Sequence, residues 1–150
     1  METLLEIGSR SHGTLRNQDI ADAILSDLRK IGCHPGNLSA IEDIAANDGE
    51  EGEFDAECIA DAMDELNAFV PAYCYYGSHE GDGSDIGVWV SMDAVDEAVR
   101  DGTILKVDDL SEADGNAAQG FEYILVVNDH GNCSLYPVIL THGEEIWGVV

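Results

Sequence analysis

Acidic side chains are the residues of this chain whose spacing most clearly suggests a chemistry, namely the attraction of cationic groups. Seven of them are concentrated in one segment: Asp48, Glu50, Glu51, Glu53, Glu57, Asp61 and Asp64. The last three recur four and three residues apart, so in a helix their carboxylates form one row with neighbours about 6 Å apart. The sequence therefore predicts that these seven residues form the binding surface for a basic partner.

The whole chain has the same one-sided charge. Its 150 residues include 31 acidic and 6 basic side chains, for a formal net charge of −25 at pH 7. Between Lys30 and Arg100 there are 17 acidic residues and no lysine or arginine. Such a surface repels nucleic acid and anionic membranes and attracts basic proteins. We therefore expect no direct nucleic-acid binding and no membrane binding.

A second candidate site is the glycine-rich loop 78–85, which contains His79, Glu80, Asp82 and Asp85. Its oxygen ligands suit Mg²⁺ or Ca²⁺, and its imidazole and carboxylates suit an acid–base pair. Glycine and aspartate are also the residues that turns between strands use. Both interpretations stay open from the sequence.

Residues 47–58 resemble the loop of a calcium-binding helix–loop–helix motif, with Gly52 at the sixth position. Three ligand positions do not match, because Asn47 replaces the first aspartate, Gly49 the third ligand and Cys58 the bidentate glutamate. A loop without these ligands binds calcium weakly. The pattern favours a solvated acidic loop before a helix.

Other metal and enzyme signatures are weak or missing. Cys33–His34 and the pair His130 and Cys133 contain zinc-binding side chains but lack two close ligand pairs of regular spacing. The sequence has no nucleophile elbow, phosphate-binding loop, dinucleotide fingerprint or zinc-protease motif. We expect no enzyme activity, no catalytic residue, no cofactor and no metal ligand.

Three helices are predicted in the N-terminal half to position these residues. Apolar residues spaced near four predict a helix over 17–31 that ends at Gly32. A capping box at Ser39–Glu42 predicts a second helix that ends before Asn47. A third helix is expected to begin at an N-cap, Asp55, and to run to 70, just before a proline.

In the C-terminal half, apolar residues alternate with other residues at a period of two. This pattern predicts strands at 72–77, 86–90, 103–107, 121–127, 133–140 and 145–150. A short helix over 92–100 is expected between the second and third of them. We therefore predict an α+β fold, with an antiparallel sheet of four to five strands and three or four helices packed mainly on one face.

The length fits a single domain over 1–150, with a helical part at about 17–70 and a strand-rich part at 72–150. No signal peptide or membrane-length apolar run is visible, and the four cysteines form no CxxC pair, so we expect a cytoplasmic protein with reduced thiols. The sequence does not decide whether Tyr73, Tyr75, Tyr76 and Trp89 fill the core or form a contact patch.

Three stretches, TLRNQDIADAILSDL, YCYYGSHEGDGSDIGVW and VVNDHGNCSLY, together resemble a loosely defined group of small, acidic, uncharacterised proteins of phages and mobile elements. The resemblance implies a counter-defence or host-takeover setting, in which acidic inhibitors of restriction or CRISPR machinery are common. It assigns no catalytic residue to this chain.

These observations lead to one expected function and two alternatives. We expect a non-enzymatic inhibitor whose seven carboxylates imitate the phosphates of nucleic acid and block a basic nucleic-acid-binding protein. The first alternative is a salt-adapted acidic domain of unrelated function. The second is a divalent-metal-binding protein that uses residues 79–85. The target, the oligomeric state and the source organism stay open.

Overall fold

The protein has an α+β fold, as predicted, with its helices and strands divided between two compact units, residues 1–90 and 91–150. The structure is a computed structural model that describes residues 5–47, 52–113, 118–138 and 145–149. Its strands form one sheet of three and one of four, where the sequence predicts a single sheet of four to five. The expectation of one domain over the whole chain stays a prediction, and each unit is described by itself.

Helix α1 (Asn17–Ile31) has the predicted bounds. Its apolar face is buried, with Ile24 and Leu28 fully inaccessible to solvent. Gly32 ends the helix in the left-handed conformation, at φ 65°, which a side chain would disfavour. The periodicity was sufficient here because an amphipathic pattern of 15 residues agrees with the glycine that ends it, although the N-cap residue Arg16 makes no side-chain capping bond.

Helix α2 (Pro35–Ala46) begins four residues before Ser39. The helix start predicted from a capping box at Ser39 and Glu42 is therefore wrong. Proline is favoured at a first helical position because its fixed φ suits the helix and its missing N–H would have no partner there. The preceding His34 accepts a hydrogen bond from the Gly36 N–H through Nδ1, at 3.0 Å. The helix ends before Asn47, as predicted.

Helix α3 (Asp55–Leu66) continues as a short 3₁₀ segment (Asn67–Phe69). The predicted N-cap, Asp55, is instead the first helical residue, and Phe54 occupies the N-cap position. The Asp55 carboxylate still accepts the N–H of Gly52, at 2.8 Å, and so stabilises the entry into the helix.

The sheet of the first unit has the order β1-β3-β2 and is antiparallel. Its strands are β1 (Gly8–Ser11), β2 (Cys74–His79) and β3 (Asp82–Val90). The sequence did not predict β1. The eight-residue loop predicted at 78–85 is mostly strand, because His79 pairs with Asp82 and only two residues form the turn.

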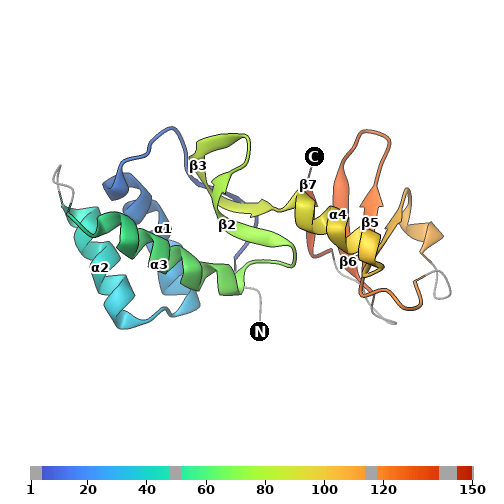
Figure 1. Ribbon diagram of the computed structural model, residues 1–150, viewed down its shortest axis with the longest axis horizontal. Coiled ribbons are helices and arrows are strands. Elements are labelled where there is room, and N and C mark those ends of the chain that lie inside the picture. Colours follow the sequence, from blue (N-terminus) through green and yellow to red (C-terminus); the bar gives the residue numbers. More distant parts are fainter. Residues whose placement is uncertain (1–4, 48–51, 114–117, 139–144, 150) are drawn as a thin grey trace. The chain divides into compact units, whose positions relative to one another are not determined.

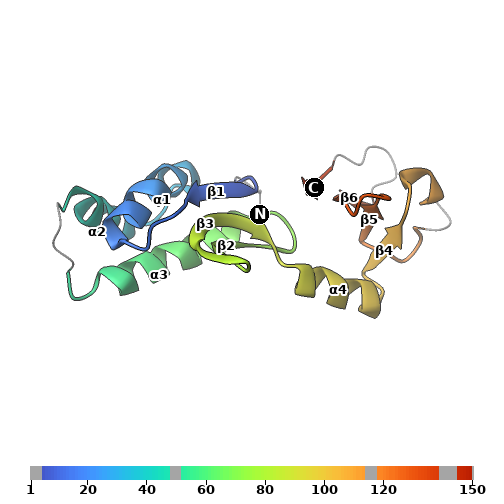
Figure 2. The same cartoon turned by 90° about the horizontal axis from the view of Figure 1, so that it is seen from above.

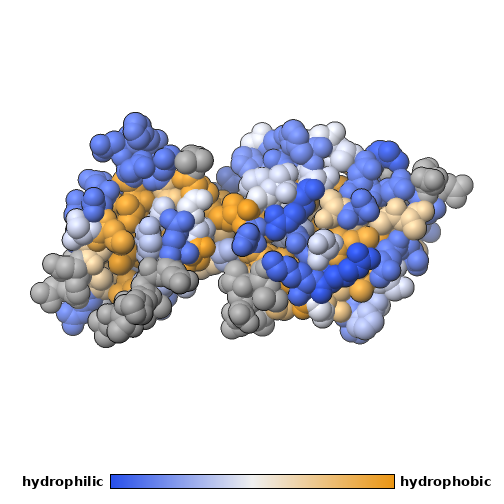
Figure 3. All heavy atoms as spheres, turned by 180° about the vertical axis from the view of Figure 1, so that it is seen from behind, coloured by the Kyte–Doolittle hydropathy of each residue, from blue (hydrophilic) through white to orange (hydrophobic). Residues whose placement is uncertain are grey.

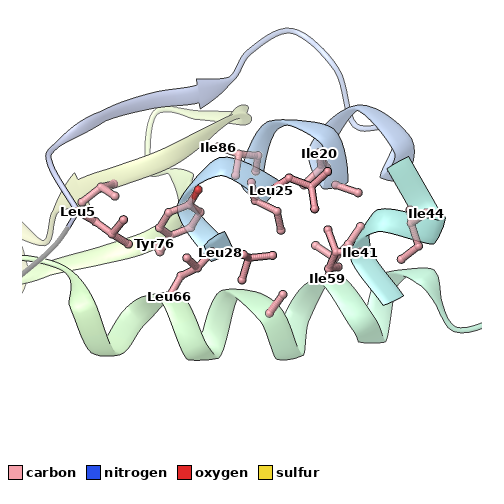
Figure 4. Packing of buried hydrophobic residues seen from close by; sticks show 14 residues of the cluster. Leu5, Ile20, Leu25, Leu28, Ile41, Ile44, Ile59, Leu66, Tyr76 and Ile86 are labelled. Atoms are coloured by element: carbon pink, nitrogen blue, oxygen red, sulfur yellow. The ribbon is translucent and has the colours of Figure 1, made fainter. Parts of the chain in front are cut away.

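Helices and sheet of the first unit share one core. Tyr76 and Ile86 of the sheet point toward the same interior as Leu28 of α1 and Leu66 of α3, and Ile41 of α2 closes it (Figure 4). All five are nearly inaccessible to solvent. Since alternate residues of a strand face opposite sides, the residues between them on β2 and β3 lie on the outer face of the sheet.

The second unit begins with helix α4 (Met92–Asp101), seen from above in Figure 2. Ser91 caps it by accepting the N–H of Ala94 at 3.4 Å, and Gly102 ends it at φ 85°. Strand β4 (Ile104–Val107) follows directly, because the left-handed glycine turns the chain back along the helix.

The sheet of the second unit has the order β4-β5-β6-β7, and β4 is an edge strand. The predicted strands 121–127 and 133–140 correspond to β5 (Tyr123–Val127) and β6 (Cys133–Pro137), which form a hairpin, and β7 (Trp147–Val149) pairs with β6. Strands β4 and β5 are parallel, which differs from the antiparallel prediction. The connection between them is long enough for the crossover that a parallel pair requires.

Both faces of this second sheet carry apolar side chains. Leu125 and Leu135 lie opposite each other on one face, and Val107 and Ile124 contribute to a cluster on the other. Each unit shows both hydrophilic side chains and apolar patches on the face seen in Figure 3. Among the described helices, none is both long and apolar enough to cross a membrane.

Candidate partner-binding surface

The outer side of α3 carries the predicted row of carboxylates. Glu57, Asp61 and Asp64 are exposed, whereas Ile59 and Leu66 on the opposite side are buried in the core. Within the described part of the chain, none of the three carboxylates has a hydrogen bond or an ion pair. Their charge is therefore available to a partner.

Small residues flank this row of carboxylates on one side. Ala56 and Ala60 are exposed on the same side of α3. Because alanine is short and uncharged, it leaves the neighbouring carboxylates uncovered and supplies no compensating cation. The helix thus presents negative charge without the intervening lysines of an ordinary solvated helix.

The remaining residues of the predicted set have two different outcomes. Glu53 is exposed just before α3. Asp48, Glu50 and Glu51 lie outside the described residues. The structure therefore brings Glu53 and the α3 row into one segment and leaves the position of the other three carboxylates as a prediction.

The charge density of the row can be compared with that of DNA. Glu57 and Asp64 are seven residues apart, so the row spans about 10 Å of helix axis and holds roughly one charge per 5 Å. Duplex DNA has one charge per about 1.7 Å of axis. The α3 row alone therefore offers about a third of the linear charge of a duplex, and imitation of DNA requires further carboxylates beside it.

The ion pairs of the described residues involve other carboxylates. Arg10 Nε contacts Asp27 Oδ2 at 2.6 Å, and the exposed Arg16 lies 3.9 Å from Asp19. Arg10 also donates to the carbonyl oxygens of Gly8 and Glu6, each at 2.9 Å. Two of the four basic residues near the N-terminus thus pair with acidic residues of α1.

Sequence reasoning missed the buried network around Asp27. Its carboxylate accepts hydrogen bonds from Arg10 and from the hydroxyl of Tyr76, at 2.7 Å. Burial, followed by the hydrogen bond with Asp27, raises the pKa of Tyr76 well above its ordinary value, so this hydroxyl stays a donor. The signal was present in the sequence, because Asp27 lies three residues after Ile24 on the apolar face of α1.

The second candidate site, the loop 78–85, is tied into the sheet. Asp82 accepts from the backbone and hydroxyl of Ser84, at 3.0 and 2.7 Å, and contacts His12 Nε2 at 3.1 Å. Asp85 accepts from the hydroxyl of Ser9. The hydrogen bonds of Ser84, followed by those of His12, lower the pKa of Asp82 below its ordinary range.

No group of three or more histidine, cysteine, aspartate or glutamate side chains suited to a metal ion occurs among the described residues. The ring of His79 instead contacts Trp89 edge-on, with the ring centroids 4.8 Å apart. The two parts of the suggested zinc site belong to different units, since Cys33 follows α1 and Cys133 lies in β6. His130 occupies a turn in which its N–H donates to Asn128 Oδ1.

A scan against protein-family models, a search of curated proteins and a search of solved structures each find no match to this chain. The function of this chain is therefore inferred from its own geometry and charge.

Proposed function

We propose that this protein is a non-enzymatic interaction protein whose acidic surface, centred on α3, binds a basic nucleic-acid-binding protein and blocks its nucleic-acid site. The observation that supports this proposal best is the exposed row of Glu57, Asp61 and Asp64, which pairs with no basic side chain in the part of the chain that the structure describes. Carboxylates on a rigid helix attract the Lys and Arg rows with which such proteins hold phosphates.

The resemblance to acidic phage proteins favours a phage-encoded inhibitor that acts in the host cytoplasm on a restriction or CRISPR nuclease. The charge density of the α3 row indicates which other carboxylates take part in the contact with the partner. Because the row has about a third of the charge of a duplex, the inhibitor binds with Glu53 and with the predicted carboxylates Asp48, Glu50 and Glu51 as well.

A second candidate, a salt-adapted domain, is favoured by how evenly the charge is distributed along the chain. Residues 1–90 contain 19 acidic and four basic side chains, and residues 91–150 contain twelve and two. The net charge per residue is therefore the same in both units. A surface shaped for one partner concentrates charge, whereas adaptation to salt spreads it over the whole molecule.

Charge reversal on α3, compared with a matched reversal on α4, tests the first candidate. The α3 variant carries Glu57→Lys, Asp61→Lys and Asp64→Lys, and the control carries Asp93→Lys, Asp96→Lys and Glu97→Lys. All six side chains are exposed, and each triple includes one residue of a first helical turn, so net charge and helix-dipole effects are matched.

Binding is measured by displacement of labelled duplex DNA from a panel of restriction and CRISPR nucleases, at 50 and 500 mM NaCl. We expect the wild type and the α4 variant to displace the duplex from one panel member at low salt, and the α3 variant to be weaker by at least about 100-fold. Equal losses in both variants would show that net charge alone is responsible. Circular dichroism melting confirms that each variant is folded.

A further inference from the structure

The outer face of the first sheet carries an aromatic group that the core does not use. Tyr75 on β2 and Trp89 on β3 are cross-strand partners, so their side chains lie side by side on one face. Tyr76 and Val88, the next residues along each strand, are buried among the helices. The rings of Tyr75 and Trp89 therefore lie on the opposite side of the sheet, where both are half-buried.

Backbone carbonyls hold the polar ends of these rings. Trp89 Nε1 donates to the oxygen of Gly77 at 3.1 Å, and the Tyr75 hydroxyl donates to the oxygen of Ser78 at 2.9 Å. The exposed His79 ring contacts the indole edge-on. With their polar atoms satisfied, the aromatic rings have a fixed orientation and offer their faces, rather than a hydrogen-bonding group, to a ligand.

The charges near this face are negative. Partial burial and then the Glu80 carboxylate raise the pKa of Tyr75, which places Glu80 close to the phenol. Asp82, two residues further, contacts His12 Nε2 at 3.1 Å and keeps 45% of its side chain exposed. Arg10 is the one lysine or arginine in the strands of this sheet, and its guanidinium is engaged by Asp27 and two carbonyls. Aromatic faces beside carboxylates fit a cation.

We propose that the outer face of the β1-β3-β2 sheet binds an arginine side chain of the basic partner, which stacks on Trp89 and Tyr75 and pairs with Glu80. The inference deepens the proposed function and rests on it for the basic character of the partner. Arginine is the expected occupant because its guanidinium is planar and weakly hydrated and stacks on aromatic rings, whereas lysine holds its water more tightly.

Fluorescence of the two tryptophans tests this proposal directly. Trp147 lies in the second unit and is 4% exposed, so Trp147→Phe leaves Trp89 as the single tryptophan, which is excited selectively over the tyrosines, and Trp89→Phe is the matched control. Each protein is titrated with nona-arginine and with nona-lysine, which have equal charge. We expect nona-arginine to change Trp89 emission, to leave Trp147 emission unchanged, and to bind the wild type about two- to fivefold more tightly than nona-lysine.

Two further variants separate this face from α3. Trp89→Leu and, independently, Tyr75→Leu should remove the preference for arginine, and the α3 charge-reversal variant should weaken both peptides equally and keep the preference. Three results would overturn the proposal and leave the rings a purely structural role. They are equal affinity of the wild type for the two peptides, Trp89 emission that does not change with nona-arginine, and a preference for arginine that persists in both leucine variants. If the α3 charge-reversal variant bound both peptides as tightly as the wild type, the proposed function would be contradicted instead.

Discussion

At the scale of single residues, Asp27 is the clearest case of a side chain whose role follows from its surroundings. A carboxylate that is 8% exposed loses most of its hydration and needs compensation. Arg10 and Tyr76 supply it from two strands, and the same guanidinium binds the carbonyls of Gly8 and Glu6. One arginine therefore neutralises the buried charge and attaches the N-terminal segment to α1.

Replacement of Arg10 by alanine should destabilise the fold by about 3 kcal/mol, since it leaves a buried carboxylate without its cation. Arg16→Ala is the matched control, because Arg16 is 62% exposed and lies 3.9 Å from Asp19, and such a surface pair contributes about 0–0.5 kcal/mol. Urea unfolding measures both. Equal effects of the two substitutions would refute a structural role for the Arg10–Asp27 pair.

Cys74 should be protected from alkylation in the folded protein. Burial raises the pKa of its thiol from 9.0 to about 12, so at pH 8.5 the native thiolate is about a thousandfold rarer than in the unfolded chain. The stabilisation that follows from this shift is complete below pH 9 and is lost as the pH rises toward 12. Mass spectrometry after iodoacetamide treatment, with and without urea, checks the protection. Equal labelling in both conditions would contradict it.

At the scale of elements, β1 depends on a glycine of another strand. A Cβ at position 87 would overlap the carbonyl oxygen of Gly8 and lie 2.9 Å from the Cα of Ser9. Both obstacles are backbone atoms and cannot move aside as a side chain would. The close approach of β1 to β3 therefore requires Gly87.

Gly87→Ala should detach β1 and cost at least about 2 kcal/mol, because the overlap cannot relax locally. Gly83→Ala, in the same strand, is the control, since a Cβ there meets nothing within 4 Å and its effect should stay within about 0.5 kcal/mol. Hydrogen exchange of the β1 amides, read together with urea unfolding, distinguishes local detachment from global loss. Protected β1 amides in the Gly87 variant would disprove the requirement.

The outer edge of β2 shows how a neighbouring helix end protects a sheet. The side-chain amide of Asn67, which follows α3, accepts the N–H of Tyr76 at 2.7 Å and donates to its carbonyl oxygen at 3.3 Å. Cys74 N–H donates to the oxygen of Pro71. These bonds occupy backbone groups that an edge strand otherwise offers to another chain.

At the scale of the whole molecule, a net charge of −25 makes salt the variable that separates the two candidate functions. At 10 mM salt the screening length is about 30 Å, comparable to the size of a small domain, and at 1 M it is about 3 Å. Repulsion among carboxylates therefore acts across each unit at low salt and only between neighbours at high salt.

An inhibitor from an ordinary cytoplasm should stay folded at 10 mM NaCl, with a melting temperature that rises moderately up to 1 M. A salt-adapted domain should already be unfolded at 10 mM at room temperature and should fold as salt is added. Circular dichroism melting across this range distinguishes the two. The α3 and α4 charge-reversal variants make the net charge less negative by the same amount. Both should therefore have a higher melting temperature than the wild type at low salt.

Local sequence patterns determined most of the helices and several strands of this protein. Helix α1, the cap of α4 by Ser91 and the β5–β6 hairpin are set by residues within a few positions of one another, and the exposed α3 row follows from the same helical period. The start of α2 was mistaken because two start signals lay close together, and the one containing Pro35 prevailed.

The tertiary structure alone decided which strands pair and which charges are compensated. Strand β1 has no apolar alternation of its own, and it exists because Gly87, about eighty residues later, leaves room for its backbone. The division into two sheets and the parallel β4–β5 pair likewise depend on contacts between distant segments. Composition sets the total charge, but only the fold distinguishes Asp27, buried and paired with Arg10, from the exposed carboxylates of α3, because desolvation and pairing depend on neighbours in space.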